Sequence, residues 1–293
     1  METITELIRT FSKDHKPCYE AEDGETLCFR TIDCFGGQVK TEADLVFEID
    51  EETADLATGP VYVKGAQPGD VLVVDILDVE VDSQGACCAA MGPLAEDCEP
   101  RTRIFPVVNR VTGFQGLEWE VDPMIGVIGV APAGEPVPCV EIGDHGGNMD
   151  SKGIKKGARV YFPVQVEGAL LAMGDLHATM GDCEISGTGI EIGGRVTVRV
   201  SVIKNFPLRY PVTETREKWY VNCARQDYET ALKDVCLEMR RLLAAAYGMD
   251  LTDAYIYMSA QCDIEINQFT LPCPIRMCIR AGVPKIPGKP LVK

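Results

Sequence analysis

The residues Val196-Thr197-Val198-Arg199-Val200-Ser201-Val202 alternate apolar and polar side chains without a break. Successive side chains of a β-strand point to opposite faces, so this run predicts a strand with its valines on a core and its polar groups in water. Residues 71–81, 127–130 and 160–166 are also rich in β-branched side chains and are bounded by Gly or Pro. They predict further half-buried or buried strands joined by Gly-rich turns.

One segment has the periodicity of a helix instead. Apolar residues at spacings of four and three line one face of it, namely Tyr228, Leu232, Val235, Met239, Leu242 and Ala246. Asp227 is suited to cap the start of this helix, and Gly248 is suited to end it. The sequence therefore predicts one main amphipathic helix near 227–247.

Together these patterns predict a β-dominated α+β fold, with Gly-rich antiparallel sheets in a sandwich- or barrel-like core. Residues 1–204 are expected to form a β-rich region that carries the chemistry. Residues 205–293 are expected to form a C-terminal α/β portion packed on the same core. Its tail after Gly282 is rich in Pro and Lys.

Composition excludes several classes of protein. The 293 residues are 46% hydrophobic and carry a formal net charge of −17, so the chain can bury a large core but is a poor ligand for nucleic acid or an anionic membrane. No stretch approaches the length of a membrane-spanning helix, and the N-terminus lacks a secretion signal. The 13 cysteines are scattered and odd in number, as in a reducing compartment. We expect a cytoplasmic protein.

The candidate chemistry is concentrated in two Gly-rich, carboxylate-rich segments, 143–150 and 174–184. They contain two of the only three histidines in the chain. In an extended strand, Asp175 and His177 would point to the same face and converge on one ion, which suits zinc or a similar divalent metal. Asp182 and Glu184 repeat this spacing, so that one would complete the coordination and the other would transfer protons.

The run from His145 to Glu191 resembles the acetamidase/formamidase family. It reads HGGNMDSKGIKKGARVYFPVQVEGALLAMGDLHATMGDCEISGTGIE, and GPVYVKGAQPGDVLVVDIL from Gly59 and DCFGGQ at 33–38 are similar to the same family. The resemblance implies a β-dominated fold and a metal-supported hydrolysis of formamide, acetamide or similarly small amides. His145, Asn148 and Asp150 match the first motif. The second motif is matched by Asp175, His177, Asp182 and Glu184.

Amide hydrolysis assigns roles to these positions. Asp175 and His177 are the first choices as metal ligands, with His145 and Asp33 second; zinc suits them best, with calcium the second option. Glu184 is the candidate that exchanges protons with water and the leaving nitrogen, and Asp182 is its nearest rival.

The oxyanion needs hydrogen-bond donors, which the backbone N–H groups around Gly147 and the Asn148 amide would supply. A pocket closed by Met149, Met180 and Cys183 would favour short acyl groups. We expect a homo-oligomer, a dimer or larger, and no organic cofactor.

The sequence also allows two other hypotheses about function. Cys183 stands where the family usually has Gly, and it would be the nucleophile of a thiol amidase, with Glu184 or His177 as base. Alternatively, the chain would be a non-catalytic β-protein that binds a metal or a small ligand.

Overall fold

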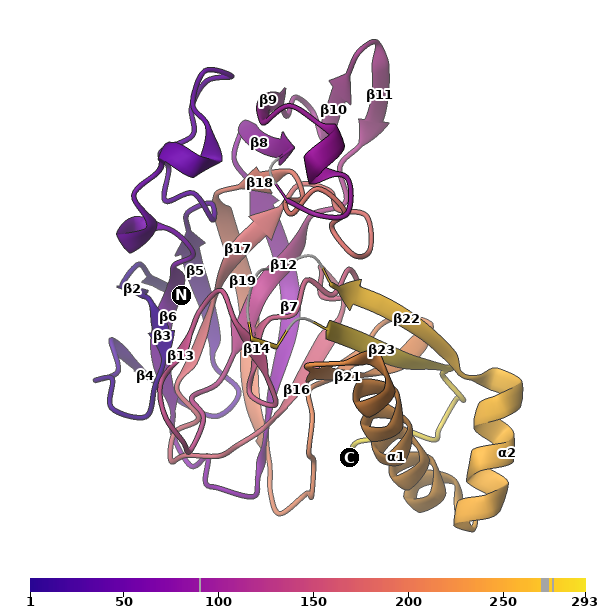
Figure 1. Cartoon of the computed structure of the whole chain (residues 1–293). Helices are drawn as coiled ribbons and strands as arrows, with labels where there is room; N and C mark the ends of the chain where they lie inside the picture. Colours follow the sequence, from indigo (N-terminus) through magenta and orange to yellow (C-terminus); the bar gives the residue numbers. More distant parts are fainter. Residues whose placement is uncertain (90, 270–273, 276) are drawn as a thin grey trace.

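The computed structural model describes residues 1–89, 91–269, 274–275 and 277–293. Over these residues the chain forms twenty-three strands and two α-helices (Figure 1). The strands gather in two large sheets, and the helices lie together beside the C-terminal strands. The β-dominated α+β class is therefore confirmed. Side chains of both sheets meet in one shared core, and over the described residues neither sheet closes into a barrel, so the core is sandwich-like.

The first sheet has nine strands. In order across the sheet they are β1 (Glu2–Ile4), β5 (Thr26–Thr31), β19 (Gly194–Ile203), β7 (Val71–Val81), β16 (Arg159–Pro163), β20 (Val212–Glu214), β21 (Lys218–Arg225), β23 (Met277–Pro284) and β22 (Asp263–Gln268). All neighbours are antiparallel except β1 and β5. Strands from both sides of residue 204 thus share one sheet. The division into two portions at that residue stays a prediction.

The second sheet has ten strands. Its main path is β14 (Ile142–Gly143), β15 (Gly146–Asn148), β12 (Met124–Gly129), β17 (Leu171–His177), β18 (Glu191–Ile192), β8 (Gln84–Ala89) and β9 (Arg101–Pro106). Off this path, β6 (Ala57–Val63) pairs with β17, and β2 (Leu7–Ile8) and β4 (Tyr19–Ala21) both pair with β6.

Smaller elements complete the chain. Two further ladders have two strands each, β10 (Val111–Phe114) with β11 (Leu117–Glu120) and β3 (Thr10–Phe11) with β13 (Val137–Pro138). The short 3-10 turns are η1 (Val46–Glu48), η2 (Glu51–Thr53) and η3 (Ala95–Asp97).

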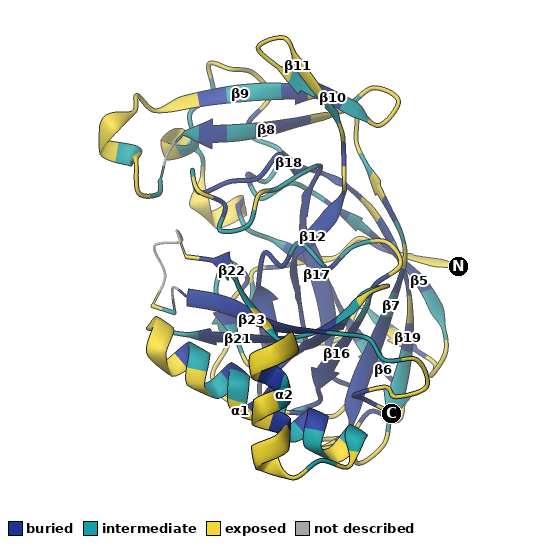
Figure 2. Cartoon of the chain, turned by 90° about the vertical axis from the view of Figure 1, so that its right-hand side faces the viewer, coloured by how far each residue is buried: buried dark blue, intermediate teal, exposed yellow. Residues whose placement is uncertain are grey.

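Strand β7 shows how the layers are stacked. Leu72 and Val74 belong to the core that the two sheets share, whereas Val71 and Val73 pack in the core under the helices. Because successive side chains alternate between faces, a strand covered on both sides needs a continuous apolar run. Strand β19 lies next to β7 and is buried on one face only. Its predicted alternation of buried and more exposed side chains is confirmed. Figure 2 shows the burial concentrated in these central strands.

The predicted helix is α1 (Tyr228–Tyr247), with Asp227 as its N-cap and Gly248 in the left-handed conformation after its end. The Asp227 side chain accepts a hydrogen bond from the Thr230 backbone N–H. Val235, Met239 and Leu242 are buried as predicted, but Tyr228 is 43% exposed. The buried face is rotated towards Ala231, Glu238 and Leu243.

A second helix, α2 (Leu251–Gln261), was not predicted. It packs on α1 and buries only Ala254 and Met258, so its sequence lacks a clear apolar stripe. Over the described residues, neither helix is long and apolar enough to cross a membrane.

Candidate active site

Four segments of chain bring five polar side chains to one buried position. Strand β17 supplies Asp175 and His177, β18 supplies Glu191, and the turns after β15 and β17 supply Asp150 and Glu184. The backbone is left-handed at Asp150 (φ 42°), Asp175 (φ 52°) and Glu184 (φ 47°). Non-glycine residues rarely adopt this conformation, and such strain collects at functional sites.

The imidazole of His177 is surrounded by carboxylates. Its Nε2 atom lies 3.2 Å from Glu191 Oε2, 3.4 Å from Asp175 Oδ1, 3.6 Å from Glu184 Oε1 and 4.0 Å from Asp150 Oδ1. All five side chains are at most 6% exposed by residue. A glycine at position 126 leaves the necessary room, because a Cβ atom there would lie 2.6 Å from both Asp150 Oδ1 and Asp175 Oδ2.

Several polar atoms of this cluster make no hydrogen bond within the described residues. They are both ring nitrogens of His177, Asp175 Oδ1 and Glu191 Oε2. Buried polar atoms nearly always have a partner, so a group of orphaned atoms around one point calls for a ligand or an ion.

Two neutral amides hold the carboxylates. Gln268, at the end of β22, donates from Nε2 to Glu184 Oε2 (2.7 Å) and to Asp150 Oδ2 (2.9 Å). The amide orientation that satisfies both side-chain atoms of Asn148 places its nitrogen 3.1 Å from Asp150 Oδ1 and 3.3 Å from Asp175 Oδ2. The C-terminal strand β22 and the first motif therefore both support the cluster.

Burial and mutual repulsion displace the pKa values of the cluster. Burial raises the pKa of Glu191 to about 8 and that of Asp150 to about 6, and it raises the pKa of Glu184 well above its usual range. Burial also opposes protonation of His177, but the charges of Glu191 and Asp175 outweigh it and raise the pKa of His177. A cation is therefore favoured at the centre of this cluster.

A cavity of about 500 Å³ opens onto the cluster. Asn148, Asp175, Glu184 and Glu191 form its polar wall. The apolar part of the wall includes Phe35, Val46, Phe47, Ile49 and Met91, and Arg9, Glu51 and Asp55 add further charged groups to the lining. A cavity with both polar groups and apolar surface in its wall can orient a small ligand that has one polar group.

Four residues that the sequence predicted for the site, His145, Asp33, Gly147 and Asp182, lie outside this cluster or only near it. His145 is buried with its ring 5.1 Å from that of Phe11, and burial lowers its pKa to about 4. Asp33 accepts a hydrogen bond from the Gly37 N–H (2.8 Å), and burial raises its pKa, with the Asp175 charge adding to the effect. Gly147 lies within β15, paired with β12 and β14.

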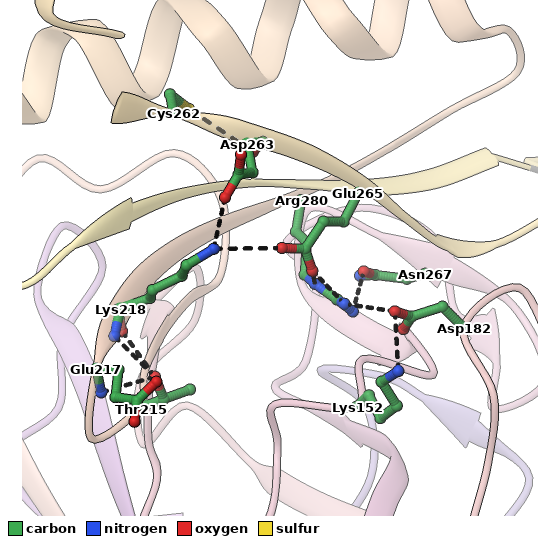
Figure 3. A network of polar contacts seen from close by, with 10 residues as sticks. All are labelled: Lys152, Asp182, Thr215, Glu217, Lys218, Cys262, Asp263, Glu265, Asn267 and Arg280. Carbon is green, nitrogen blue, oxygen red and sulfur yellow. Dashed lines mark hydrogen bonds and ion pairs between the residues drawn. The ribbon is translucent and has the colours of Figure 1, made fainter. Parts of the chain in front are cut away.

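Asp182 faces away from Glu184. Its carboxylate pairs with Arg280 (2.8 Å) and Lys152 (3.1 Å), in a charged network that also includes Glu265 and Asn267 (Figure 3). The left-handed backbone at Cys183 (φ 73°) and Glu184 turns successive side chains differently from a strand. The same-face spacing expected for Asp182 and Glu184 therefore does not hold here.

Three residues of the site had no role in the sequence analysis. Glu191 closes the family-like run, Cys34 follows Asp33, and Gln268 lies far away in the C-terminal portion. A buried carboxylate in a short apolar stretch was a usable signal for Glu191. No local pattern singles out Gln268, because its role depends on the pairing of β22 and on the parallel bridge from Gln268 to Cys183.

Ligand atoms of the described residues fall into two groups that could each hold a metal ion. Asp150, His177 and Glu184 form one group, and Cys34, Asp175 and Glu191 form the other, with the ligand atoms of each group within 4.8 Å of one another. His145, Asp33 and Asp182 belong to neither group. Nitrogen, oxygen and sulfur ligands together suit a transition-type divalent metal such as zinc.

Comparisons with known proteins agree with one another. A family model described as the acetamidase/formamidase family matches residues 5–137 and 131–279. The crystal structure of an acetamidase from Bacillus halodurans is 36% identical with a TM-score of 0.92, over 96% of this chain and 97% of that chain.

Two curated relatives are more distant. A putative formamidase from Schizosaccharomyces pombe is 28% identical over 63% of this chain, and a formamidase from Methylophilus methylotrophus is 29% identical over 64%. The alignments span 61% and 62% of those relatives' own lengths, so the chain matches about three fifths of each.

Proposed function

The chain belongs to the acetamidase/formamidase family, and from this premise we propose that it hydrolyses small aliphatic amides with the help of a divalent metal ion. The reaction adds water across the amide C–N bond and yields a carboxylate and ammonia. The names of the relatives, formamidase and acetamidase, support substrates with a short acyl group.

One observation carries the proposal. A buried imidazole is surrounded by four carboxylates at the wall of a cavity, and its two ring nitrogens, Asp175 Oδ1 and Glu191 Oε2 make no hydrogen bond among the described residues. Such a cluster of like charges is costly without a cation, since each ionised carboxylate raises the energy of the others. A purely structural network would instead have its lone pairs satisfied.

These residues fit a metal ion. Asp175 and His177 are the first choices as ligands, and Asp150 and Glu191 are further carboxylates within 4.0 Å of the His177 Nε2 atom. When bound, a divalent ion lowers the pKa of a water molecule towards about 7 and polarises the amide oxygen. His145 and Asp33 are weaker choices, because neither joins a ligand group of the described residues.

Glu184 is the preferred proton acceptor. It lies in the cavity wall, and burial raises its pKa, so it binds a proton more readily than an exposed glutamate. Gln268 keeps its carboxylate oriented. Asp182 is the weaker candidate, because its carboxylate is held by Arg280 and Lys152.

Asn148 is a better placed oxyanion donor than Gly147, but its N–H groups face Asp150 and Asp175, so an oxyanion would have to replace one of these carboxylates as their acceptor. Its amide group lies in the cavity wall, whereas Gly147 lies within the ladders of β15.

The thiol mechanism is less well supported. A nucleophilic cysteine needs a lowered pKa, but burial and the charges of Asp182 and Glu184 raise the pKa of the Cys183 thiol. The non-catalytic reading predicts that metal binds without amide turnover. The expected homo-oligomer and cytoplasmic location stay predictions.

The test measures metal and ammonia on the same preparation. Purified protein is depleted with a chelator, reloaded with zinc or calcium, and assayed for ammonia release from formamide, acetamide and propionamide. We expect turnover only in the reloaded protein. Tightly bound metal without ammonia release from any short amide would favour the non-catalytic reading.

A further inference from the structure

A thiol faces the cluster from the turn that follows β5. Cys34 lies in the wall of the cavity, and its Sγ atom forms a ligand group with carboxylate oxygens of Asp175 and Glu191, all within 4.8 Å of one another. The turn is fixed on both sides, because the Cys34 carbonyl accepts a hydrogen bond from the Asp55 N–H (2.7 Å) and Asp33 accepts one from Gly37.

The two carboxylates provide a second, independent observation. Asp175 is 6% exposed and Glu191 is 2% exposed. Asp175 Oδ1 and Glu191 Oε2 lie 3.4 and 3.2 Å from the His177 Nε2 atom, but neither contact has the geometry of a hydrogen bond, and no other described residue donates to these two atoms. Two carboxylates this deeply buried, with poor hydrogen-bond geometry and a sulfur atom beside them, are arranged to share a cation.

Two buried thiols, Cys139 and Cys88, are satisfied by hydrogen bonds. Cys139 lines the same cavity but donates to the Ile8 carbonyl, and Cys88 pairs with the Thr102 hydroxyl. Those contacts are the usual way to satisfy a buried S–H group. Across the part of the chain that the structure describes, Cys34 has no such hydrogen bond and faces carboxylates instead.

We propose that Cys34 is a thiolate ligand that makes the metal site select a thiophilic divalent ion of the zinc class over calcium or magnesium. This inference rests on the metal site of the proposed function and deepens it. Sulfur ligands favour zinc and similar ions, whereas calcium and magnesium take oxygen ligands almost exclusively. A carboxylate or hydroxyl at position 34 would leave a site of oxygen and nitrogen atoms that discriminates much less.

Cobalt is the probe, because a Co²⁺–thiolate bond adds a charge-transfer absorption in the near ultraviolet that oxygen and nitrogen ligands do not give. Metal-depleted wild-type protein is titrated with Co²⁺ beside Cys34→Ser and the matched control Cys139→Ser. We expect the band in the wild type and the control, and its loss in Cys34→Ser. We also expect the Kd of zinc to rise by at least about 10-fold in Cys34→Ser, the lower end of what even an outer-shell change costs.

A measurement on the wild type alone covers the case in which Cys34→Ser does not fold. X-ray absorption of the zinc-loaded protein should show a sulfur neighbour at about 2.3 Å besides nitrogen or oxygen at about 2.0–2.1 Å. Bound metal with no sulfur neighbour, or a cobalt band that survives in Cys34→Ser, overturns the inference and leaves the proposed amidase intact. A sulfur-ligated metal in a protein without amide turnover supports the inference and refutes the proposed activity.

Discussion

The side-chain nitrogen of Gln268 lies 2.7 Å from the Glu184 carboxylate, and it also donates to Asp150 at 2.9 Å. One neutral amide on the C-terminal strand β22 therefore holds two carboxylates that lie far earlier in the sequence. Hydrogen bonds to charged groups contribute about 1.5–3 kcal/mol each, so this contact matters for both the shape and the stability of the site.

Gln268→Met should lower kcat by about 10-fold or more while KM changes less. Methionine has a similar length but no donor, so Glu184 and Asp150 lose their fixed orientation. The measurement is steady-state ammonia release together with urea unfolding. Gln84→Met is the control, because Gln84 is exposed and donates only to the Lys40 carbonyl. Equal kinetics in the two variants would show that Gln268 has no positioning role.

His177→Ala should lower the metal content and the activity together, by at least about 10-fold, while the fold is kept. The imidazole lies at the centre of the four carboxylates, so no other described side chain takes its place. The measurement is metal analysis after dialysis, with circular dichroism as the check on folding. His145→Ala is the control and should keep its metal. Full occupancy in His177→Ala would refute the ligand assignment.

Glu184→Gln should reduce turnover by about 10²-fold or more, because it removes the proton acceptor and keeps nearly the same shape. Cys183→Ser should keep substantial activity. Ammonia release from both variants is measured at saturating acetamide. An inactive Cys183→Ser beside a nearly normal Glu184→Gln would replace the proposed mechanism with the thiol mechanism.

The sequence predicts an element of the fold well when its apolar side chains recur with the period of a strand or a helix and so mark one buried face. The alternation of β19 and the stripe of α1 each encode which face is buried, and both are as predicted over most of their length. Helix α2 was missed because it buries only two side chains and exposes Tyr255 and Ile256.

Only part of the candidate site could be predicted from the sequence. Asp175 and His177 lie in the same strand, so their local spacing brings them together, whereas Glu184 reaches the cluster only through a left-handed turn. Asp182 has the same spacing to Glu184, but its partner Arg280 comes from β23 and could not be foreseen locally. The expected closure by Met149 did not occur, since alternation along the chain turns Asn148 to the cavity and Met149 into the core.

His145 should make the metal-free protein less stable in acid. Its pKa falls from 6.5 to about 4 because burial disfavours the charged form. Between these values the unfolded chain binds a proton that the folded chain does not, so the stabilisation is full above pH 6.5 and is lost as the pH falls towards 4. The shift corresponds to roughly 3 kcal/mol at most.

His145→Gln cannot titrate, so its unfolding free energy should fall less than that of the wild type between pH 7 and pH 4.5. Urea unfolding of both proteins at several pH values gives this difference. Parallel pH dependences for the two proteins would show that His145 is not buried in its neutral form.

The length of the acyl group should decide turnover, and Met91 should set the limit. Formamide, acetamide and propionamide should release ammonia, with a decline for longer or aromatic amides and complete loss after treatment with a strong chelator. Met91 lies in the apolar wall of the cavity, and its side chain faces Gly187, where an added Cβ atom would lie 2.7 Å from the Met91 Cβ. Met91→Ala removes the bulk of this side chain and should shift the preference towards longer acyl chains. Each additional buried methylene contributes about 0.8 kcal/mol, or roughly a 4-fold gain in kcat/KM per carbon.

The measurement is kcat/KM over the series from formamide to hexanamide for both proteins, with Leu237→Ala, a change on the exposed face of α1, as the control. An unchanged length profile in Met91→Ala would place the limit elsewhere in the cavity, and efficient cleavage of peptides or esters but not of short amides would refute the proposed substrate class.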